Sequence, residues 1–517
     1  MAPLSLAASL TAVSIIAMKV VLFPIFIFTV YVIFNEAVRW SRRIKGLKGP
    51  VGLPIVGNLL DINKSYTAEK YRQWSLKYGP VYQIQLGNST VVIVNAAEDA
   101  KTLFLNQTSS LISRPLFHIF HKLVTKDVAS IGTSPWNESC KNRRKAAAAS
   151  LNRPKVQSYE PLIIRETADF IGDLTVDSRN GAVDVDFADA IQRLSLNTVM
   201  SLNYGIRIAN TNSMKHDYSE IIEVESEISR LRSTSKNLSN YIPLLQFLEP
   251  IFWKKSTAHA ADIGNRRIKY NNELLQRLKD AMAQGVDKPC IQGNVLRDPE
   301  ATGLSNNELL SISLSMMAGA DSIQPAIGWA FLLLAHRKDI QKRAFEEFQS
   351  VVKDDYSLHE TKDVEYILSV VKETLRFYSP VPLSMPREST APLHYKDTII
   401  PKGTMVFLNA WACNHDPALF PEPWQFLPER WQNSGLEKHA HQFAFGYGSR
   451  MCIATHLATR LIYTVIYHTI ANFEIHPALN ATADEWDSVQ GLKDPNALSS
   501  SPRASKARFT ERRRSTE

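Results

Sequence analysis

A lone cysteine follows a glycine-rich loop near the C-terminal end of the 517-residue sequence, with defining residues at Phe445, Gly446, Gly448, Arg450 and Cys452. Glycines allow tight backbone bends against a flat ligand. Residues 455–467 have helical spacing, and N–H groups at the start of that helix would lower the thiol pKa and favour thiolate. This pattern predicts an axial thiolate for haem iron, which favours O–O cleavage. The alternative, a buried structural cysteine, leaves the loop's spacing unexplained.

Asp321 and Ser322 are neighbours in an apolar run with helical spacing, residues 309–334. A carboxylate and a hydroxyl are costly to bury without a partner or a function. An acid beside an alcohol can deliver the two protons that activation of bound dioxygen requires. Pro325 offers no N–H to the carbonyl of Asp321, so a kink that opens a groove is expected there. Asp321 and Ser322 are the predicted catalytic residues; the alternative is a kinked core helix without catalysis.

The elements that must position these residues are mostly helical. Helical spacing dominates residues 135–380, whereas residues 81–86 and 90–94 predict a β-hairpin and residues 398–409 a second one. Residues 417–428 are proline-rich and irregular. Hydrophobic residues make up 44% and charged residues 21%, which excludes bulk disorder. The expected fold class is mainly α with small β-sheets (α+β), in one large domain.

The N-terminal segment is apolar over residues 4–34, apart from Lys19 and Pro24. About 20 helical residues cross a bilayer, and residues 15–34 would serve as an anchor. A cleaved signal peptide is disfavoured because no charged residue precedes Lys19 and the apolar run is too long. Basic residues follow the run, so the positive-inside tendency places the rest of the chain in the cytosol.

Charge and cysteine content further limit the kinds of partner and of cysteine site that the protein could have. Lys and Arg number 59 against 51 Asp and Glu, giving a net charge of +8. Spread over this length, that charge fits an acidic protein partner or an anionic membrane better than nucleic acid. Four cysteines without a C-x-x-C pair disfavour a disulfide scaffold and a zinc knuckle.

Residues 445–454 resemble the haem-binding signature of the cytochrome P-450 monooxygenases, with Ala454 where that family usually has glycine. Three more motifs occur in the family's order. The resemblance implies the cytochrome P-450 fold, haem b (iron protoporphyrin IX) with Cys452 as the metal ligand, and insertion of one oxygen atom from O2. It further implies electrons from NADPH through a reductase with an acidic docking face, and a single-pass endoplasmic reticulum protein with a cytosolic catalytic domain. Residues 141–145 are interpreted as the docking patch or as a solvated basic face.

These interpretations divide the chain into four parts. Residues 1–36 are the expected transmembrane anchor and residues 37–60 a basic, proline-containing hinge. Residues 61–510 are the expected haem-thiolate monooxygenase domain, and residues 511–517 a basic tail.

The resemblance also implies roles for individual residues. Glu373, Arg376 and Arg430 are expected to form the family's buried ion triad, whose members depend on one another because a lone buried charge is costly. The expected cofactor-binding residues besides Cys452 are Arg450, Phe445, Arg387, Trp136 and Arg143.

Besides Ala454, three positions depart from the family pattern. Cys140 stands where the family has an arginine four residues after the tryptophan, and Arg143, seven residues after Trp136 on the same expected helical face, is assigned in its place. In the distal helix Ser322 replaces the usual threonine, and Ile323 occupies a position that usually carries a second hydroxyl.

Several stretches look most like the phenylacetate-hydroxylase branch found in fungi: residues 131–136, 140–145, 194–208, 290–295 and 448–452. This implies a small aromatic substrate, either an aromatic acid hydroxylated on its ring or an aromatic-derived secondary metabolite. Residues 320–329 depart from that branch. The expected pocket segments are residues 111–126, 231–253, 380–385 and 497–502. The residues considered for a substrate carboxylate are Arg114, His118, His121 and Lys122.

Two other functions remain open. A haem-thiolate isomerase, dehydratase or peroxide-driven enzyme would not use a reductase, and the change at Ser322 and Ile323 is compatible with it. A membrane-tethered haem carrier or sensor is disfavoured by the acid–alcohol pair in the apolar run.

Overall fold

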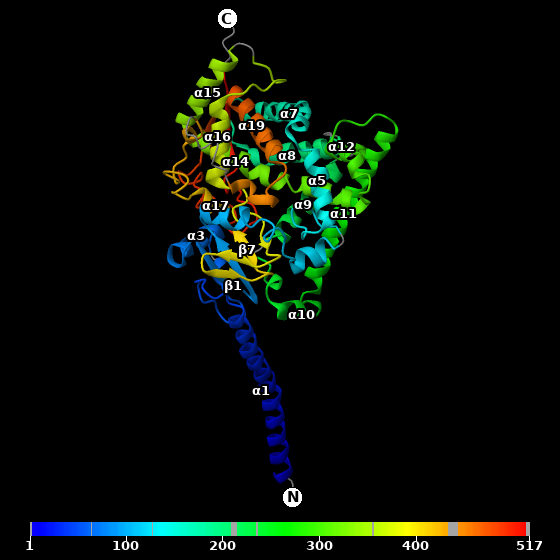
Figure 1. The fold of residues 1–517 in the computed structure, drawn as a ribbon, viewed down its shortest axis with the longest axis vertical. Coiled ribbons are helices and arrows are strands. Elements are labelled where there is room, and N and C mark those ends of the chain that lie inside the picture. The colour runs from blue at the N-terminus through cyan, green and yellow to red at the C-terminus, as the bar shows by residue number, and fades with distance from the viewer. Residues whose placement is uncertain are drawn as a thin grey trace.

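The computed structural model describes residues 3–63, 65–126, 128–207, 215–233, 236–353, 356–432 and 443–512. One long helix, α1 (Pro3–Ser41), projects from a mostly helical body (Figure 1). The helices described in the body are α2 (Leu59–Ile62), α3 (Thr67–Tyr78), α4 (Ala97–Ala100), α5 (Glu138–Ala149), α6 (Arg153–Ser158), α7 (Glu160–Ser178), α8 (Phe187–Tyr204), α9 (Lys215–Leu231), α10 (Pro243–Phe252), α11 (Lys254–Ala283), α12 (Ile291–Arg297), α13 (Asn306–Met317), α14 (Ala320–His336), α15 (Lys338–Val352), α16 (Glu365–Tyr378), α17 (Ala410–Asn414) and α19 (Thr455–Asn472).

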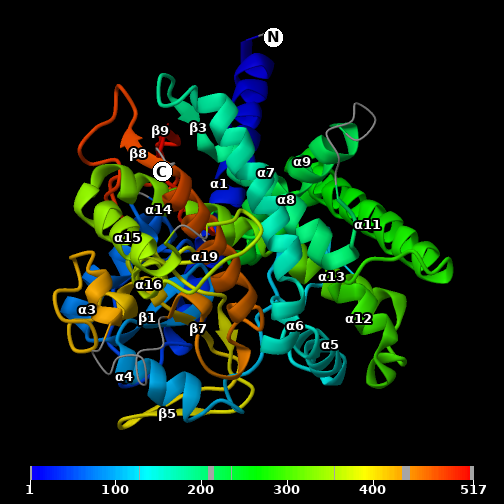
Figure 2. The same ribbon diagram turned by 90° about the horizontal axis from the view of Figure 1, so that it is seen from above.

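The core is built around α14, whose residues 325–335 are all apolar. Trp329 and Phe331 are fully buried, and the Trp329 ring stacks on Tyr378 of α16 with centroids 4.4 Å apart. Helices α8, α16 and α19 pack against α14. Seen from above, α14 and α19 lie between α15 and α11 (Figure 2). Close packing of residues 325–335 holds the start of α14 in a fixed place.

The apolar run that contains Asp321 forms two helices, α13 and α14, with a break at Ala318 and Gly319. A single helix kinked at Pro325 was expected. The chain tightens at the break, where Gly319 N donates to Met316 O at 2.9 Å and Ser322 N to Gly319 O at 3.2 Å. Pro325 lies inside α14. Asp321 and Ser322 therefore occupy the first turn of a helix.

The strands form small sheets, as expected for the predicted fold class. Strands β1 (Val81–Leu86), β2 (Ser89–Val94), β7 (Met405–Leu408) and β4 (Arg387–Glu388) form one sheet in that order. Strands β3 (Val185–Asp186), β9 (Lys506–Glu511) and β8 (Phe473–Pro477) form another, and β5 (Leu393–Tyr395) pairs with β6 (Thr398–Ile400).

The first predicted hairpin is confirmed and the second is wrong. β1 and β2 pair antiparallel, with Leu86 opposite Ser89. In the second case β6 pairs with the preceding β5, whereas β7 runs parallel to β2 and pairs with β4. The turn at residues 401–403 therefore carries the chain from one sheet to another, which alternation of residue types does not reveal. Pairing with β7 places Arg387 of β4 beside the cysteine loop.

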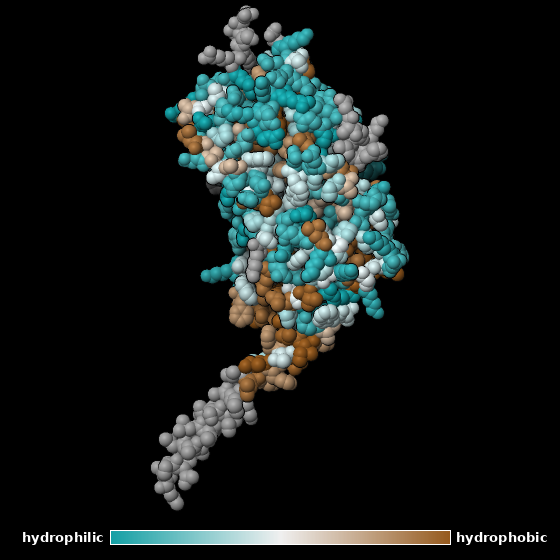
Figure 3. All heavy atoms as spheres, turned by 90° about the vertical axis from the view of Figure 1, so that its left-hand side faces the viewer, coloured by the Kyte–Doolittle hydropathy of each residue, from teal (hydrophilic) through white to brown (hydrophobic). Residues whose placement is uncertain are grey.

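The N-terminal helix α1 continues beyond residue 36, the predicted end of the anchor segment. It ends at Ser41, and Leu22–Ser41 is long and apolar enough to cross a membrane. Arg39 donates to Leu53 O at 2.8 Å and to the Glu36 carboxylate at 2.7 Å. The predicted hinge is thus bonded to the base of the helix. Hydrophobic surface gathers where α1 meets the body (Figure 3).

The C-terminal boundary also shifts. Glu511 belongs to β9, and the Arg512 guanidinium donates to Ile470 O at 3.0 Å. Residues 511 and 512 are therefore part of the body, and residues 513–517 of the predicted tail lie outside the described residues.

Candidate active site

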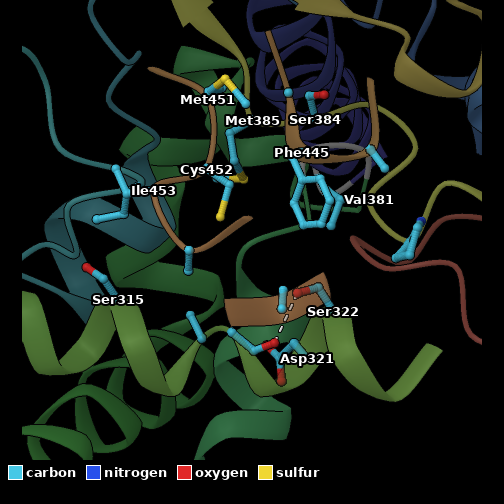
Figure 4. Close-up of a pocket in the computed structure, with 18 of the residues that line it drawn as sticks. Ser315, Asp321, Ser322, Val381, Ser384, Met385, Phe445, Met451, Cys452 and Ile453 are labelled. Atoms are coloured by element: carbon cyan, nitrogen blue, oxygen red, sulfur yellow. Dashed lines mark hydrogen bonds between the residues drawn. The ribbon is translucent and has the colours of Figure 1, made fainter. Parts of the chain in front are cut away.

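Two glycines and one backbone hydrogen bond shape the cysteine loop. Gly446 and Gly448 have φ angles of +75° and +71°, which residues with a Cβ rarely adopt. A Cβ at Gly448 would lie 2.1 Å from the carbonyl oxygen of Phe104. Cys452 N donates to Phe445 O at 2.9 Å, which turns the chain back just before α19. The Cys452 thiol points into a cavity (Figure 4).

The protein alone does not favour the thiolate form of Cys452. Three of the four cysteines are buried, and Cys452 is accessible from the cavity. Burial among protein atoms raises the pKa of the Cys452 thiol, while the Ala454 N–H and the charge of Arg144 lower it. The expected effect of the N–H groups at the helix start is present, but burial outweighs it. A coordinated thiol is deprotonated by its metal, so the thiolate would follow from iron ligation.

The cavity, of about 290 Å³, separates Cys452 from the first turn of α14. Cys452 and Phe445 lie on one side, and Asp321 and Ser322 face them from the other (Figure 4). Apolar side chains line the space between, among them Val199, Ile323, Val381, Leu457, Leu461 and Leu498. The space suits a flat apolar ring system together with an apolar ligand.

Five arginines line this cavity without an acidic ion-pair partner among the described residues. We call four of them, Arg114, Arg144, Arg387 and Arg450, the arginine cluster. Burial and mutual repulsion lower the pKa of Arg387 to about 9 and that of Arg450 to about 10. Buried cations that repel one another require anions. A ligand with two carboxylates, such as the two propionates of haem, fits this cluster.

Backbone carbonyls hold the cluster in position. Arg450 donates to Ile112 O at 3.0 Å and Ile131 O at 2.8 Å. Arg387 donates to Leu111 O at 3.1 Å and also to the carbonyl of Tyr447 in the cysteine loop.

The assignment of Arg143 to the cofactor needs correction. Its guanidinium donates to Ala129 O at 3.1 Å and to the Ser311 hydroxyl, away from the residues that line the cavity. Asn137 caps α5, so Trp136 precedes the helix and helical spacing from it does not apply. The neighbouring Arg144 lines the cavity instead.

Trp136 is likewise absent from the residues that line the cavity. Its ring lies 5.5 Å from the Arg450 guanidinium. Trp136 thus contacts the arginine cluster through Arg450, a cation–π arrangement.

The distal acid is poised to exchange protons near neutral pH. Burial, with a smaller contribution from Glu225, raises the pKa of Asp321 to about 7, while Arg232 and Arg267 oppose the rise. Asp321 Oδ2 is buried and has no hydrogen-bond partner among the described residues. The Ser322 hydroxyl donates to Gly319 O at 3.0 Å. An acid whose pKa lies near the working pH is suited to general acid–base catalysis.

The predicted ion triad is present. The Glu373 carboxylate accepts from Arg376 at 2.8 Å and from Arg430 at 3.0 Å, and from Trp431 Nε1 at 2.9 Å. Arg376 also donates to the carbonyl of Asn414 at 2.8 Å. These bonds join α16 to the irregular segment ahead of the cysteine loop.

The residues considered for a substrate carboxylate have other partners or positions. Arg114 belongs to the arginine cluster, and Lys122 is exposed. His118 Nε2 lies 2.7 Å from Glu249, and both ring nitrogens of His121 contact backbone groups. The expected pocket segment at residues 231–253 contains Arg232, a fifth cavity arginine, but the sequence did not single it out because one arginine after a helix carries no pattern.

The basic run at residues 141–145 does not form one face. Lys141 and Lys145 are exposed and pair with Glu138 at 3.2 Å and Glu300 at 2.8 Å. Between them, Arg143 is buried. The run is therefore divided between the surface and the interior.

Together these features identify the class. Among the described residues, no group of three or more His, Cys, Asp or Glu side chains could hold a bare metal ion, so an iron bound to Cys452 would take its other ligands from a macrocycle. The cavity, the accessible thiol and the arginine cluster fit haem, and the acid–alcohol pair opposite the thiol is typical of a haem-thiolate oxygenase.

Comparison with known proteins agrees. The sequence profile described as cytochrome P450 matches residues 47–495, so the chain belongs to the cytochrome P450 family. It is a haem-dependent monooxygenase of mainly helical fold.

Relatives of known activity align over most of the chain. It is 44% identical to 3-hydroxyphenylacetate 6-hydroxylase of Emericella nidulans, over 93% of this chain and 92% of that protein. It is 41% identical to phenylacetate 2-hydroxylase of Emericella nidulans, over 91% of each chain. It is 37% identical to cytochrome P450 monooxygenase CYP3 of Mycosarcoma maydis, over 90% of this chain and 87% of that protein.

Proposed function

We propose that this protein hydroxylates the ring of a small aromatic acid, with electrons from NADPH supplied by a reductase. One oxygen atom of O2 enters a C–H bond and the other leaves as water, with two electrons from NADPH and two protons. The substrate class is supported by the two phenylacetate hydroxylases that align with nine-tenths of the chain.

The observation that carries the proposal is the position of Asp321 and Ser322 across the cavity from Cys452 (Figure 4). Haem, when bound, supplies the reductive activation of dioxygen. The protein contributes the Cys452 thiolate as ligand and the arginine cluster as the site for the propionates. Asp321 can donate a proton and take up another, because its pKa is raised to about 7.

Attachment to the endoplasmic reticulum membrane through α1 belongs to the same proposal. α10 lies at the end of the body from which α1 emerges (Figure 1). Its Phe247, Ile251 and Phe252 side chains are exposed, and exposed apolar groups of this kind mark contact with a membrane or a partner.

Reconstitution with a reductase tests the proposal. Phenylacetate and 3-hydroxyphenylacetate should shift the haem spectrum, and labelled O2 should give products that carry one labelled oxygen. Cys452→Ser should lose the carbon-monoxide band of thiolate-ligated haem. Turnover without NADPH or O2 would instead establish an isomerase, a dehydratase or, with added peroxide, a peroxide-driven enzyme.

A further inference from the structure

Arg232 lines the cavity and has no ionic partner among the described residues. It follows α9 directly, and its Nε is buried without a hydrogen-bond partner. Its guanidinium lies 4.0 Å from Met385 Sδ and 5.9 Å from the centre of the Phe120 ring. The Arg232 residue as a whole is half-buried and opens onto the cavity. A charge without a partner in a largely apolar space is costly, so a group of this kind in a ligand cavity calls for an anion that is not part of the protein.

Arg232 lies at the edge of the arginine cluster, because it lines a second, smaller pocket together with Arg114 and both side chains contact Met385. The charges that act on Arg232 are those of Asp321, Arg267 and Glu225, and no member of the cluster is among them. The cluster members act on one another. Arg232 therefore lies between Arg114 of the cluster and Asp321 of the first turn of α14.

The nearby carboxylates do not neutralise Arg232. Glu225 is bound by Arg267 at 2.7 Å and also accepts from the Tyr270 hydroxyl. Asp321 acts on Arg232 through space, but no ion pair joins the two. The positive charge of Arg232 therefore remains available to a ligand.

Much of the rest of the cavity wall is apolar, including Ile323, Val381 and Leu498, although serines such as Ser315 and Ser384 also line it. A ligand with a carboxylate at one end and an aromatic ring at the other matches one cation beside an apolar space.

We propose that Arg232 binds the carboxylate of the substrate, an aromatic monocarboxylic acid, and so selects acids over their neutral analogues. The guanidinium fork can donate two parallel hydrogen bonds to a carboxylate. This assignment rests on the proposed function for its substrate class, and it makes Arg232 a specificity-determining residue.

Spectral titration of the haem-loaded, full-length protein with phenylacetate and its neutral analogue phenylacetamide tests the assignment. Arg232→Gln should weaken phenylacetate binding by about 30-fold or more, the cost of removing one partner of a buried charge pair. Phenylacetamide binding should change little. Arg232→Lys should retain part of the preference for the acid. The matched control is Arg230→Gln, because Arg230 is an exposed residue of α9 paired with Glu227. It should bind both ligands like the parent.

Equal loss of both ligands in Arg232→Gln, or no loss of phenylacetate, would overturn the role of Arg232. Equal affinity of the parent for the acid and the amide would overturn it without any variant. The proposed function fails differently: the parent would then neither bind nor hydroxylate any aromatic acid, although it retains the carbon-monoxide band of thiolate-ligated haem.

Discussion

Gly448 and Gly446 offer a matched pair of substitutions within the cysteine loop. Both have positive φ angles, so alanine at either position incurs the left-handed penalty of about 1–2 kcal/mol. In Gly446→Ala the new Cβ would make only an ordinary contact, 3.9 Å from Met451 Cα. In Gly448→Ala the new Cβ would lie 2.1 Å from Phe104 O. Ordinary van der Waals contact begins at 3.4 Å, so the overlap in Gly448→Ala should cost about 1–3 kcal/mol more through overpacking against a rigid group.

The loop can relieve the Gly448→Ala overlap by moving away from Phe104, but that movement would also displace Tyr447, whose carbonyl accepts from Arg387. The strain should therefore appear as weaker haem binding. A difference of about 1–3 kcal/mol corresponds to about 5- to 150-fold in affinity relative to Gly446→Ala. Haem transfer to an excess of a competing apoprotein measures this ratio. If the two variants lose haem equally, the contact with Phe104 does not position the loop.

Three further predictions concern the triad, the arginine cluster and the distal acid. Glu373→Gln should lower the free energy of unfolding by about 3–5 kcal/mol, because it leaves two buried arginines without their anion. The temperature at which half of the haem absorption band is lost should fall, and an unchanged midpoint temperature would contradict this prediction. Arg144→Gln should weaken haem binding more than Arg143→Gln, and the reverse order in haem titrations would restore the sequence-based assignment. Asp321→Asn should slow product formation. Since the Asp321 pKa is raised from 3.8 to about 7, the native protein keeps a proton that the unfolded chain has lost. The parent therefore loses stability as the pH rises from 3.8 to about 7, whereas Asp321→Asn has no such loss. The advantage of the variant over the parent in thermal stability should then be larger at pH 8 than at pH 5, and an equal advantage at both would refute the pKa shift.

The sequence alone predicted those features whose residues lie close together in the chain. The cysteine loop, the acid–alcohol pair and the first hairpin are local patterns, and the structure shows each as a local unit. The triad of Glu373, Arg376 and Arg430 was found through family resemblance, because only tertiary packing brings these residues together.

The failures of sequence reasoning have a common physical cause. Arg143 and Arg144 differ by one position, and the start of α5 at Glu138 decides which one faces the cavity. The partner of β7 is β2, more than 300 residues earlier in the chain. Arg232 becomes significant only because no carboxylate of the described fold reaches it. Such properties depend on where helices begin and on which segments pack together, and spacing along the chain does not record them.

If Arg232 binds the substrate carboxylate, we expect substrate binding to affect proton delivery by Asp321. Burial raises the Asp321 pKa most, and Glu225 also raises it. The charges of Arg232 and Arg267 and a hydrogen bond from Ser229 lower it. A substrate carboxylate bound to Arg232 would cancel the Arg232 contribution, so the Asp321 pKa should rise further and the acid should hold its proton when substrate is present. The pH at which NADPH use becomes uncoupled from product should then lie higher with phenylacetate than with phenylacetamide. Identical pH profiles for the two ligands would show that the two side chains act independently.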